Sequence, residues 1–157
     1  MTFRISGLPV EPFVPLYGLD DDALIQVGAR RYTADTMPGF PCRVTLKDAE
    51  PGERVLLINY VHQPADTPYR ASHAIYVCEG ALLTASFVDE VPASLSGRQL
   101  SVRAFDGIGM MLDADLVDGT DLEGLIAFFL SNDAIAYLQI HYAKRGCYAA
   151  RVDRAGG

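Results

Sequence analysis

The stretch Ala136-Tyr-Leu-Gln-Ile-His-Tyr-Ala-Lys-Arg-Gly-Cys-Tyr-Ala-Ala-Arg-Val-Asp153 decides the fold. Residues 136–142 alternate in polarity, which is typical of a half-buried strand, and residues 147–153 can form its partner in a hairpin. The segment between them ends on Gly146, a residue that readily adopts the left-handed conformation of a turn. We therefore predict an antiparallel hairpin with Tyr137, Gln139 and His141 on one face and Leu138, Ile140 and Tyr142 on the other.

Working outward, other apolar runs bounded by turn residues predict further strands. They cover residues 2–6, 30–33, 54–61, 72–78, 83–88, 99–105 and 110–117. A three-residue loop, Gly107–Gly109, would place Arg103 opposite Asp113 in the second-last hairpin. We interpret Asp113 and Asp115 as solvated or salt-bridged strand residues, not as an acid/base pair.

Two segments carry helix-start signals. Asp20 can cap a short helix in which Leu19 and Leu24 have the spacing of a hydrophobic staple. Thr120 and Glu123 have capping-box spacing before a second apolar stripe. The chain therefore predicts a single α+β domain over residues 1–157, with one largely antiparallel, strongly curved sheet and two helices.

Composition limits the classes of function. The 157 residues are 50% hydrophobic and 21% charged, and the net charge is −7, which argues against partners such as nucleic acid or anionic membranes. No segment approaches the roughly 20 apolar residues of a membrane span, and the N-terminus lacks the pattern of a secretory signal. The three cysteines include no CxxC pair, so we expect reduced thiols and a cytoplasmic location.

The last hairpin suggests a catalytic pair. If its loop has three residues, His141 lies opposite Ala149 and diagonally adjacent to Cys147, with Arg145 nearby. Cys147 could then act as a nucleophile and His141 as a general base. The alternative is that Cys147 is a small buried apolar residue and that His141 is a hydrogen-bonded core residue.

The loop that joins residues 54–61 to 72–78 suggests a ligand site. His62, Tyr69, Arg70 and His73, together with Arg145, could bind a phosphate or carboxylate through charge-assisted hydrogen bonds. Eleven of the thirteen cations are arginine, which suits bidentate capture of anions, although arginine-rich codon usage would give the same count. The alternative is a structural loop that Pro64 and Pro68 make rigid.

Metal and cofactor signatures are missing from the sequence. The closest pair of histidines, His62 and His73, is separated by ten residues, whereas zinc sites usually include a pair such as HxH or CxxC. We therefore predict no metal site, although folding could still bring the three histidines together. The sequence also lacks GxxxxGK[ST], GxGxxG, GxSxG and HExxH motifs, so it indicates no particular cofactor.

Three separate segments resemble the bacterial family known as domain of unknown function 1203. They are Gly39–Arg43, His62–His73 and Arg145–Arg151, and the overall layout is similar from near the first residue to the last. The resemblance implies a small soluble bacterial protein. It implies no activity, because the family has none assigned. Two of these segments, His62–His73 and Arg145–Arg151, coincide with the two candidate sites described above.

These observations lead to three hypotheses. The first is a protein that binds a small anionic metabolite in a pocket lined by His, Arg and Cys, with Arg70 and Arg145 as anion clamps. The second is a non-catalytic interaction or oligomerisation module, which could form a homo-oligomer. The third is a small enzyme that uses Cys147 and His141.

Overall fold

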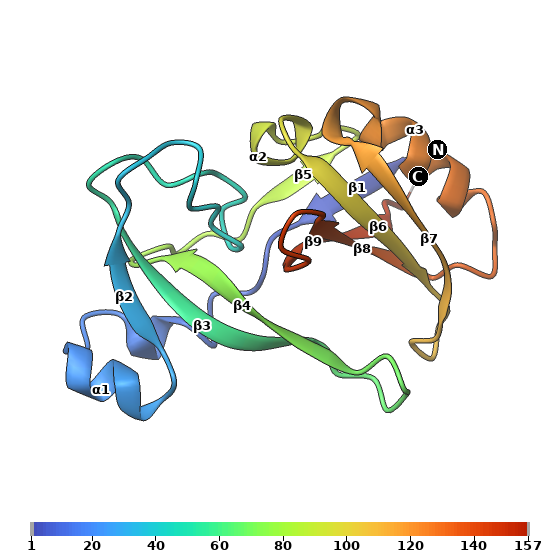
Figure 1. Ribbon diagram of the computed structural model, residues 1–157. Helices are drawn as coiled ribbons and strands as arrows, with labels where there is room; N and C mark the ends of the chain where they lie inside the picture. The colour runs from blue at the N-terminus through green and yellow to red at the C-terminus, as the bar shows by residue number, and fades with distance from the viewer. Residues whose placement is uncertain (1, 157) are drawn as a thin grey trace.

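The computed structural model describes residues 2–156 and contains two antiparallel sheets (Figure 1). The larger sheet has the strand order β5-β1-β9-β8-β6-β7. It is formed by β1 (Phe3–Ser6), β5 (Ser86–Val88), β6 (Gln99–Phe105), β7 (Met111–Asp118), β8 (Tyr137–Tyr142) and β9 (Tyr148–Arg154). The smaller sheet has the order β2-β3-β4. Its strands are β2 (Arg30–Thr33), β3 (Arg54–Gln63) and β4 (Ala71–Cys78). The strands thus lie where the alternation predicted them, to within a few residues.

The expectation of one strongly curved sheet was wrong, because the strands divide into two groups. After β4 the chain turns at Gly80, and the next strand, β5, pairs with β1 instead of with β4. Within residues 2–156, β2 is therefore the one further strand that pairs with the β3–β4 hairpin. In Figure 1 the smaller sheet lies on the left, and the far end of the β3–β4 hairpin extends below the larger sheet.

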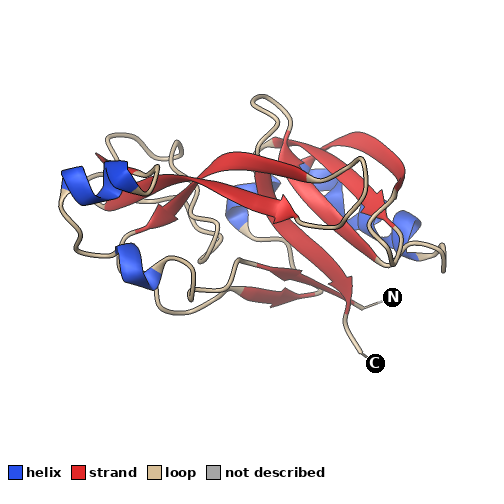
Figure 2. Ribbon diagram, turned by 90° about the horizontal axis from the view of Figure 1, so that it is seen from below, coloured by secondary structure: helices blue, strands red, loops and turns tan. Residues whose placement is uncertain are grey.

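The helices are short, as Figure 2 shows beside the long strands. They comprise α1 (Asp21–Gln26), α2 (Ala93–Ser96), α3 (Leu122–Leu130) and the 3₁₀ turns η1 (Val14–Leu16) and η2 (Gly119–Asp121). Asp20 caps α1 as predicted, since its carboxylate accepts a hydrogen bond from the Ala23 amide at 2.8 Å. The count of two helices was wrong because α2 was missed. The Thr120 cap was also wrong, since Thr120 belongs to η2 and α3 begins after it.

The main hydrophobic core covers one face of the larger sheet. Leu138 and Ile140 of β8 pack there with Leu122, Ile126 and Phe129, which lie on the buried stripe of α3. A second core joins the two sheets, because Tyr148 of β9 packs with Ile75 and Val77 of β4. The polar alternate positions of β8 therefore face away from α3, towards the smaller sheet. Among residues 2–156, no helix is long and apolar enough to cross a membrane.

Three β-bulges change the register within the sheets, and two of them overturn sequence predictions. Near the turn, Phe105 pairs with Met111, as the three-residue loop requires, but an extra residue at Leu112 then pairs Arg103 with Ala114. The expected contact of Arg103 with Asp113 is therefore not formed. Likewise Ile140 pairs with Ala150 as predicted, whereas a bulge at Ala149 brings Tyr148 opposite His141. Alternation alone cannot locate such extra residues.

Candidate functional site

Three histidines from three strands meet between the two sheets. His62 of β3, His73 of β4 and His141 of β8 each offer a ring nitrogen, and these atoms all lie within 4.8 Å of one another. His62 is the extra residue of the third bulge, since Val61 pairs with Ser72 and Gln63 with Ala71. We call these three residues the histidine cluster.

The bulge explains how β3 reaches the larger sheet. It allows two consecutive side chains to point the same way, which a regular strand does not permit. His62 Nδ1 lies 2.8 Å from Gln139 Oε1, and Gln63 Nε2 donates to the Tyr137 hydroxyl at 2.7 Å. Bulges are common next to functional sites because they redirect side chains in this manner.

Hydrogen bonds connect the members of the histidine cluster. His62 Nε2 lies 2.7 Å from His73 Nδ1, and the two ring planes are only 13° apart. His141 Nδ1 lies 3.0 Å from the Gly146 carbonyl oxygen, while its Nε2 lies 3.2 Å from Gln139 Oε1. The Gln139 amide nitrogen donates to the His62 carbonyl oxygen at 3.0 Å. The side chain of Gln139 thus links β8 to β3.

Burial keeps the cluster uncharged near neutral pH. It lowers the pKa of His141, which is fully buried, to about 3 and the pKa of His62 to about 4. The pKa of His73 is lowered for the same reason. The positive charge of Arg103 also lowers the pKa of each of the three histidines. Uncharged imidazoles have free lone pairs and can accept a hydrogen bond or bind a cation.

A groove of about 980 Å³ begins beside the cluster. His73 is a member of the histidine cluster and also lines the groove, which extends between β4, the segment 35–43 and the β8–β9 hairpin. Its basic lining residues are Arg43, Arg98, Lys144 and Arg145. Asp35 is the acidic residue of the lining, so positive charge predominates there although the whole chain carries a net charge of −7.

Arg43 is the most unusual of these cations because its side chain is buried. Its guanidinium donates to the carbonyl oxygens of Tyr148 and Pro41, both at 2.8 Å, and to Cys147 Sγ at 3.0 Å. All three acceptors are uncharged groups or a thiol sulfur. Within residues 2–156 no carboxylate forms an ion pair with Arg43. A buried cation without a counter-charge is costly, so an anion in the groove would stabilise it.

Arg98 and Arg43 lie against the same aromatic ring. The guanidinium carbon of each is 5.0 Å from the centroid of the Tyr142 ring. Arg98 differs from Arg43 in having a counter-charge, because it forms a bidentate pair with Asp48 at 2.6 and 3.1 Å. Arg98 therefore supports the shape of the groove, whereas the charge of Arg43 is still available to a ligand.

The structure brings together only some of the predicted site residues. His73, Arg145 and Cys147 line the groove, and His62 and His141 lie in the adjoining cluster. Tyr69 and Arg70 do not line the groove. The ring of Tyr69 packs edge-on against Phe105, and Arg70 donates to the Pro64 carbonyl oxygen within its own loop.

The predicted contact between His141 and Cys147 is not formed. Cys147 is opposite Tyr142, whose amide donates to the Cys147 carbonyl oxygen at 2.9 Å, and its sulfur packs against the main core and Arg43. His141 points to the other face of the hairpin, towards the histidine cluster. The four-residue loop causes this separation, because it shifts the register by one residue relative to the three-residue loop that was expected.

Sequence reasoning missed Arg43, Arg98 and Gln139 as site residues. Gln139 could have been included, because it shares the polar face of its strand with His141. The segment containing Arg43 follows two closely spaced prolines, but nothing local shows that its side chain would be buried. Arg98 lies just before a strand and has no signal that separates it from a surface residue.

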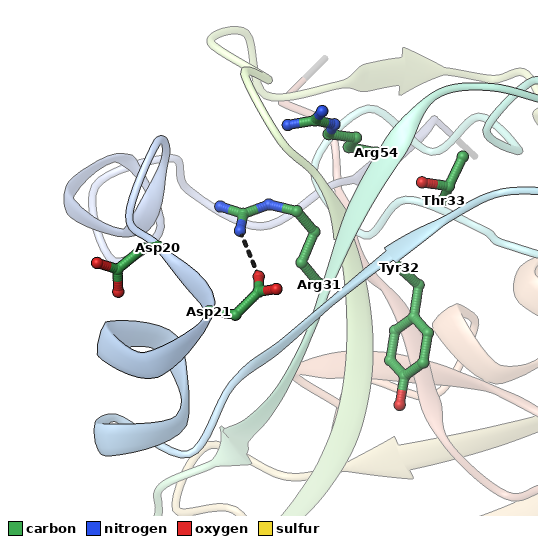
Figure 3. A pocket seen from close by; sticks show the side chains of 6 residues that line it. All are labelled: Asp20, Asp21, Arg31, Tyr32, Thr33 and Arg54. Atoms are coloured by element: carbon green, nitrogen blue, oxygen red, sulfur yellow. Dashed lines mark hydrogen bonds and ion pairs between the residues drawn. The ribbon is translucent and has the colours of Figure 1, made fainter.

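A second depression, to which no residue of the histidine cluster contributes, lies between α1 and the strands β2 and β3 (Figure 3). Arg31 occupies its centre and forms ion pairs with Asp21 at 2.8 Å and with Glu79 at 2.7 Å. Because both acids neutralise this guanidinium, we interpret Arg31 as a structural residue and not as a ligand clamp.

The comparison with known families agrees with the sequence resemblance. The family described as "Protein of unknown function (DUF1203)" matches residues 39–154. The chain belongs to the DUF1203 family. No curated protein and no solved structure matches it. The region matched to DUF1203 contains the histidine cluster and every cationic residue of the groove.

Proposed function

We propose that this DUF1203 protein is a cytoplasmic protein that binds a small anionic metabolite in the groove beside the histidine cluster. The observation that carries the proposal is the buried Arg43 guanidinium, which pairs with no carboxylate of residues 2–156 and borders a groove rich in positive charge. The three free cysteines agree with a reducing compartment.

The groove offers two kinds of contact to such a ligand. Arg145 and Lys144 are exposed on the β8–β9 turn and can approach a phosphate or carboxylate from solvent. Arg43 and Tyr142 form a preorganised inner wall, because packing and hydrogen bonds already fix their positions. A ligand with a charged group and an apolar or aromatic part fits this combination, since Phe40 and Tyr76 also line the groove.

Thermal stability measured against a panel of anions tests the proposal. Inorganic phosphate, citrate, short dicarboxylates and nucleotides are suitable probes. A ligand with a dissociation constant of about 1 mM, added at about 10 mM, should stabilise the fold by roughly 1.4 kcal/mol, which corresponds to a few degrees in Tm. Sodium chloride at matched ionic strength controls for general screening.

Charge reversal at two exposed arginines separates specific binding from a general effect. Arg145→Glu should abolish the stabilisation by the anion, because residue 145 lines the groove. Arg4→Glu makes the same change in net charge on β1, outside the groove, and should leave the stabilisation intact. Equal loss in both variants, or no stabilising anion in the panel, would favour a non-catalytic interaction or oligomerisation module.

A further inference from the structure

We propose that His62, His73 and His141 bind a divalent transition-metal ion, for which Zn²⁺ is the probe. The inference rests on the geometry of the histidine cluster and does not depend on an anion in the groove. It departs from the sequence expectation, because no two of these histidines are close enough in the chain to form a recognisable motif.

The separations within the cluster fit one ion. Four ligands placed tetrahedrally at Zn–N distances of about 2.0 Å lie roughly 3.3 Å from one another. The closest ring nitrogens, those of His62 and His73, are 2.7 Å apart, and all three ligand atoms lie within 4.8 Å. The first separation is shorter than the tetrahedral value and the second is an upper limit that exceeds it. Small side-chain rotations therefore suffice to coordinate an ion.

The polar contacts of His141 favour a cation at its Nε2 atom. An uncharged imidazole has one N–H, but both nitrogens of His141 face oxygen atoms, those of Gly146 and Gln139. One nitrogen must therefore direct its lone pair at an oxygen, which is repulsive. Exchanging the oxygen and nitrogen of the Gln139 amide does not solve the problem. The Gln139 oxygen would then face the His62 carbonyl oxygen at 3.0 Å, which is also repulsive. A cation bound at Nε2 of His141 removes the conflict.

The surroundings of the rings match those of metal-binding histidines. Such histidines usually donate their second N–H to a carbonyl or carboxylate, which fixes the ring and its tautomer. The Gly146 carbonyl oxygen can fill this role for Nδ1 of His141, and Gln139 Oε1 can fill it for Nδ1 of His62. Each of these two rings then presents Nε2 to the ion, and His73 presents Nδ1, which faces His62.

The cluster also provides access and a vacant coordination position. His73 lines the groove, so an ion can enter from there and would lie at that end of the groove. Three histidines supply one ligand fewer than a closed tetrahedral site has, which leaves a position for water or an anion. Arg103 opposes the charge of the ion, and it would favour an anion or hydroxide as the fourth ligand.

Titration of tag-free, chelator-treated protein with Zn²⁺ by calorimetry tests the site, with Co²⁺ absorption as a spectroscopic readout. We expect one ion per chain and the absorption of tetrahedral or five-coordinate Co²⁺ bound to nitrogen. His73→Ala, at a half-buried position, should weaken binding at least about 100-fold. Cys147→Ser should leave both the affinity and the Co²⁺ spectrum unchanged, because Cys147 is not in the cluster.

A second variant tests the site without removing any of the three histidines. Arg103→Met removes the opposing charge and should tighten Zn²⁺ binding by on the order of tenfold. Far-UV circular dichroism establishes that each variant folds. No Zn²⁺ binding at micromolar concentrations, affinity unchanged by His73→Ala, or affinity unchanged by Arg103→Met would each overturn the proposal. None of these measurements includes an organic anion, so their failure leaves the anion proposal standing.

Discussion

The guanidinium of Arg43 donates a hydrogen bond to Cys147 Sγ at 3.0 Å, joining residues 104 positions apart in the chain. The same side chain donates to the carbonyl oxygen of Tyr148, so it fastens the segment before β3 to the β8–β9 hairpin. Arg43 thus links the two sheets at the wall of the groove.

Replacing Arg43 should destabilise the protein strongly. Arg43→Met removes three hydrogen bonds and leaves the buried carbonyl oxygens of Tyr148 and Pro41 without that donor. Each such loss costs about 1–3 kcal/mol, so we expect the free energy of unfolding to fall by roughly 3 kcal/mol in urea titrations. Arg4→Met, at an exposed position of β1, should change it by less than about 0.5 kcal/mol. Similar values for the two variants would mean that the Arg43 contacts contribute little.

A bound anion should protect one cysteine from alkylation. Cys147 lines the groove, whereas Cys42 is buried and Cys78 is half-buried outside the lining. Adding an anion that raises Tm should slow iodoacetamide modification of Cys147, measured by peptide mass spectrometry. The rate at Cys78 should stay constant and serves as the internal reference. Equal slowing at both thiols would indicate general stabilisation and not occupation of the groove.

The β6–β7 turn should tolerate alanine at one glycine and not at the other. Gly109 has φ +92°, and a Cβ there would collide with the Ala65 side chain in the β3–β4 loop. Gly109→Ala should therefore lower the free energy of unfolding by about 2 kcal/mol or more. A Cβ on Gly107 would meet nothing within 4 Å, so Gly107→Ala is the matched control. Urea unfolding of both variants measures the difference, and equal effects would contradict the close packing at Gly109.

Stability at acid pH should depend on Glu79. Its hydrogen bonds to Arg31 hold the pKa of this carboxyl below its ordinary value. The resulting stabilisation is fully present above the unfolded pKa of about 4.3 and is lost as pH falls through the lower folded value. The stability advantage of the wild type over Glu79→Gln should therefore shrink below about pH 4.

Thermal unfolding of the two proteins between pH 3 and pH 7 measures this effect. Glu11→Gln changes an exposed acid whose side chain forms no hydrogen bond within residues 2–156, and this variant should follow the wild-type curve. A constant difference between wild type and Glu79→Gln over the whole range would show that the pair with Arg31 does not affect the titration of Glu79.

Local sequence patterns located the strands but not their pairing. Alternation is a property of each strand alone, so residues 99–105 and 136–142 were recognisable without knowledge of their neighbours. The extra residues at His62, Leu112 and Ala149 depend on contacts between strands. The division into two sheets also arises from tertiary contacts, since β5 pairs with β1, which lies 80 to 84 residues earlier.

The candidate site was predictable only in part for the same reason. The sequence left open that His62, His73 and His141 could come together, and the structure brings their rings together. The burial of Arg43 depends on its contact with the β8–β9 hairpin, and Arg70 bonds to the Pro64 carbonyl oxygen of its own loop instead of facing the groove. No pattern along the chain encodes that packing.

The histidine cluster draws two ligand atoms from the smaller sheet and one from the larger sheet. An ion bound there therefore cross-links the two sheets, and its binding free energy adds to the stability of the contact between them. Amide hydrogens of β3 and β4 would then exchange with solvent more slowly when the ion is bound. The hydrogen-exchange rate of this hairpin therefore reports whether the histidine cluster holds an ion, without an activity assay.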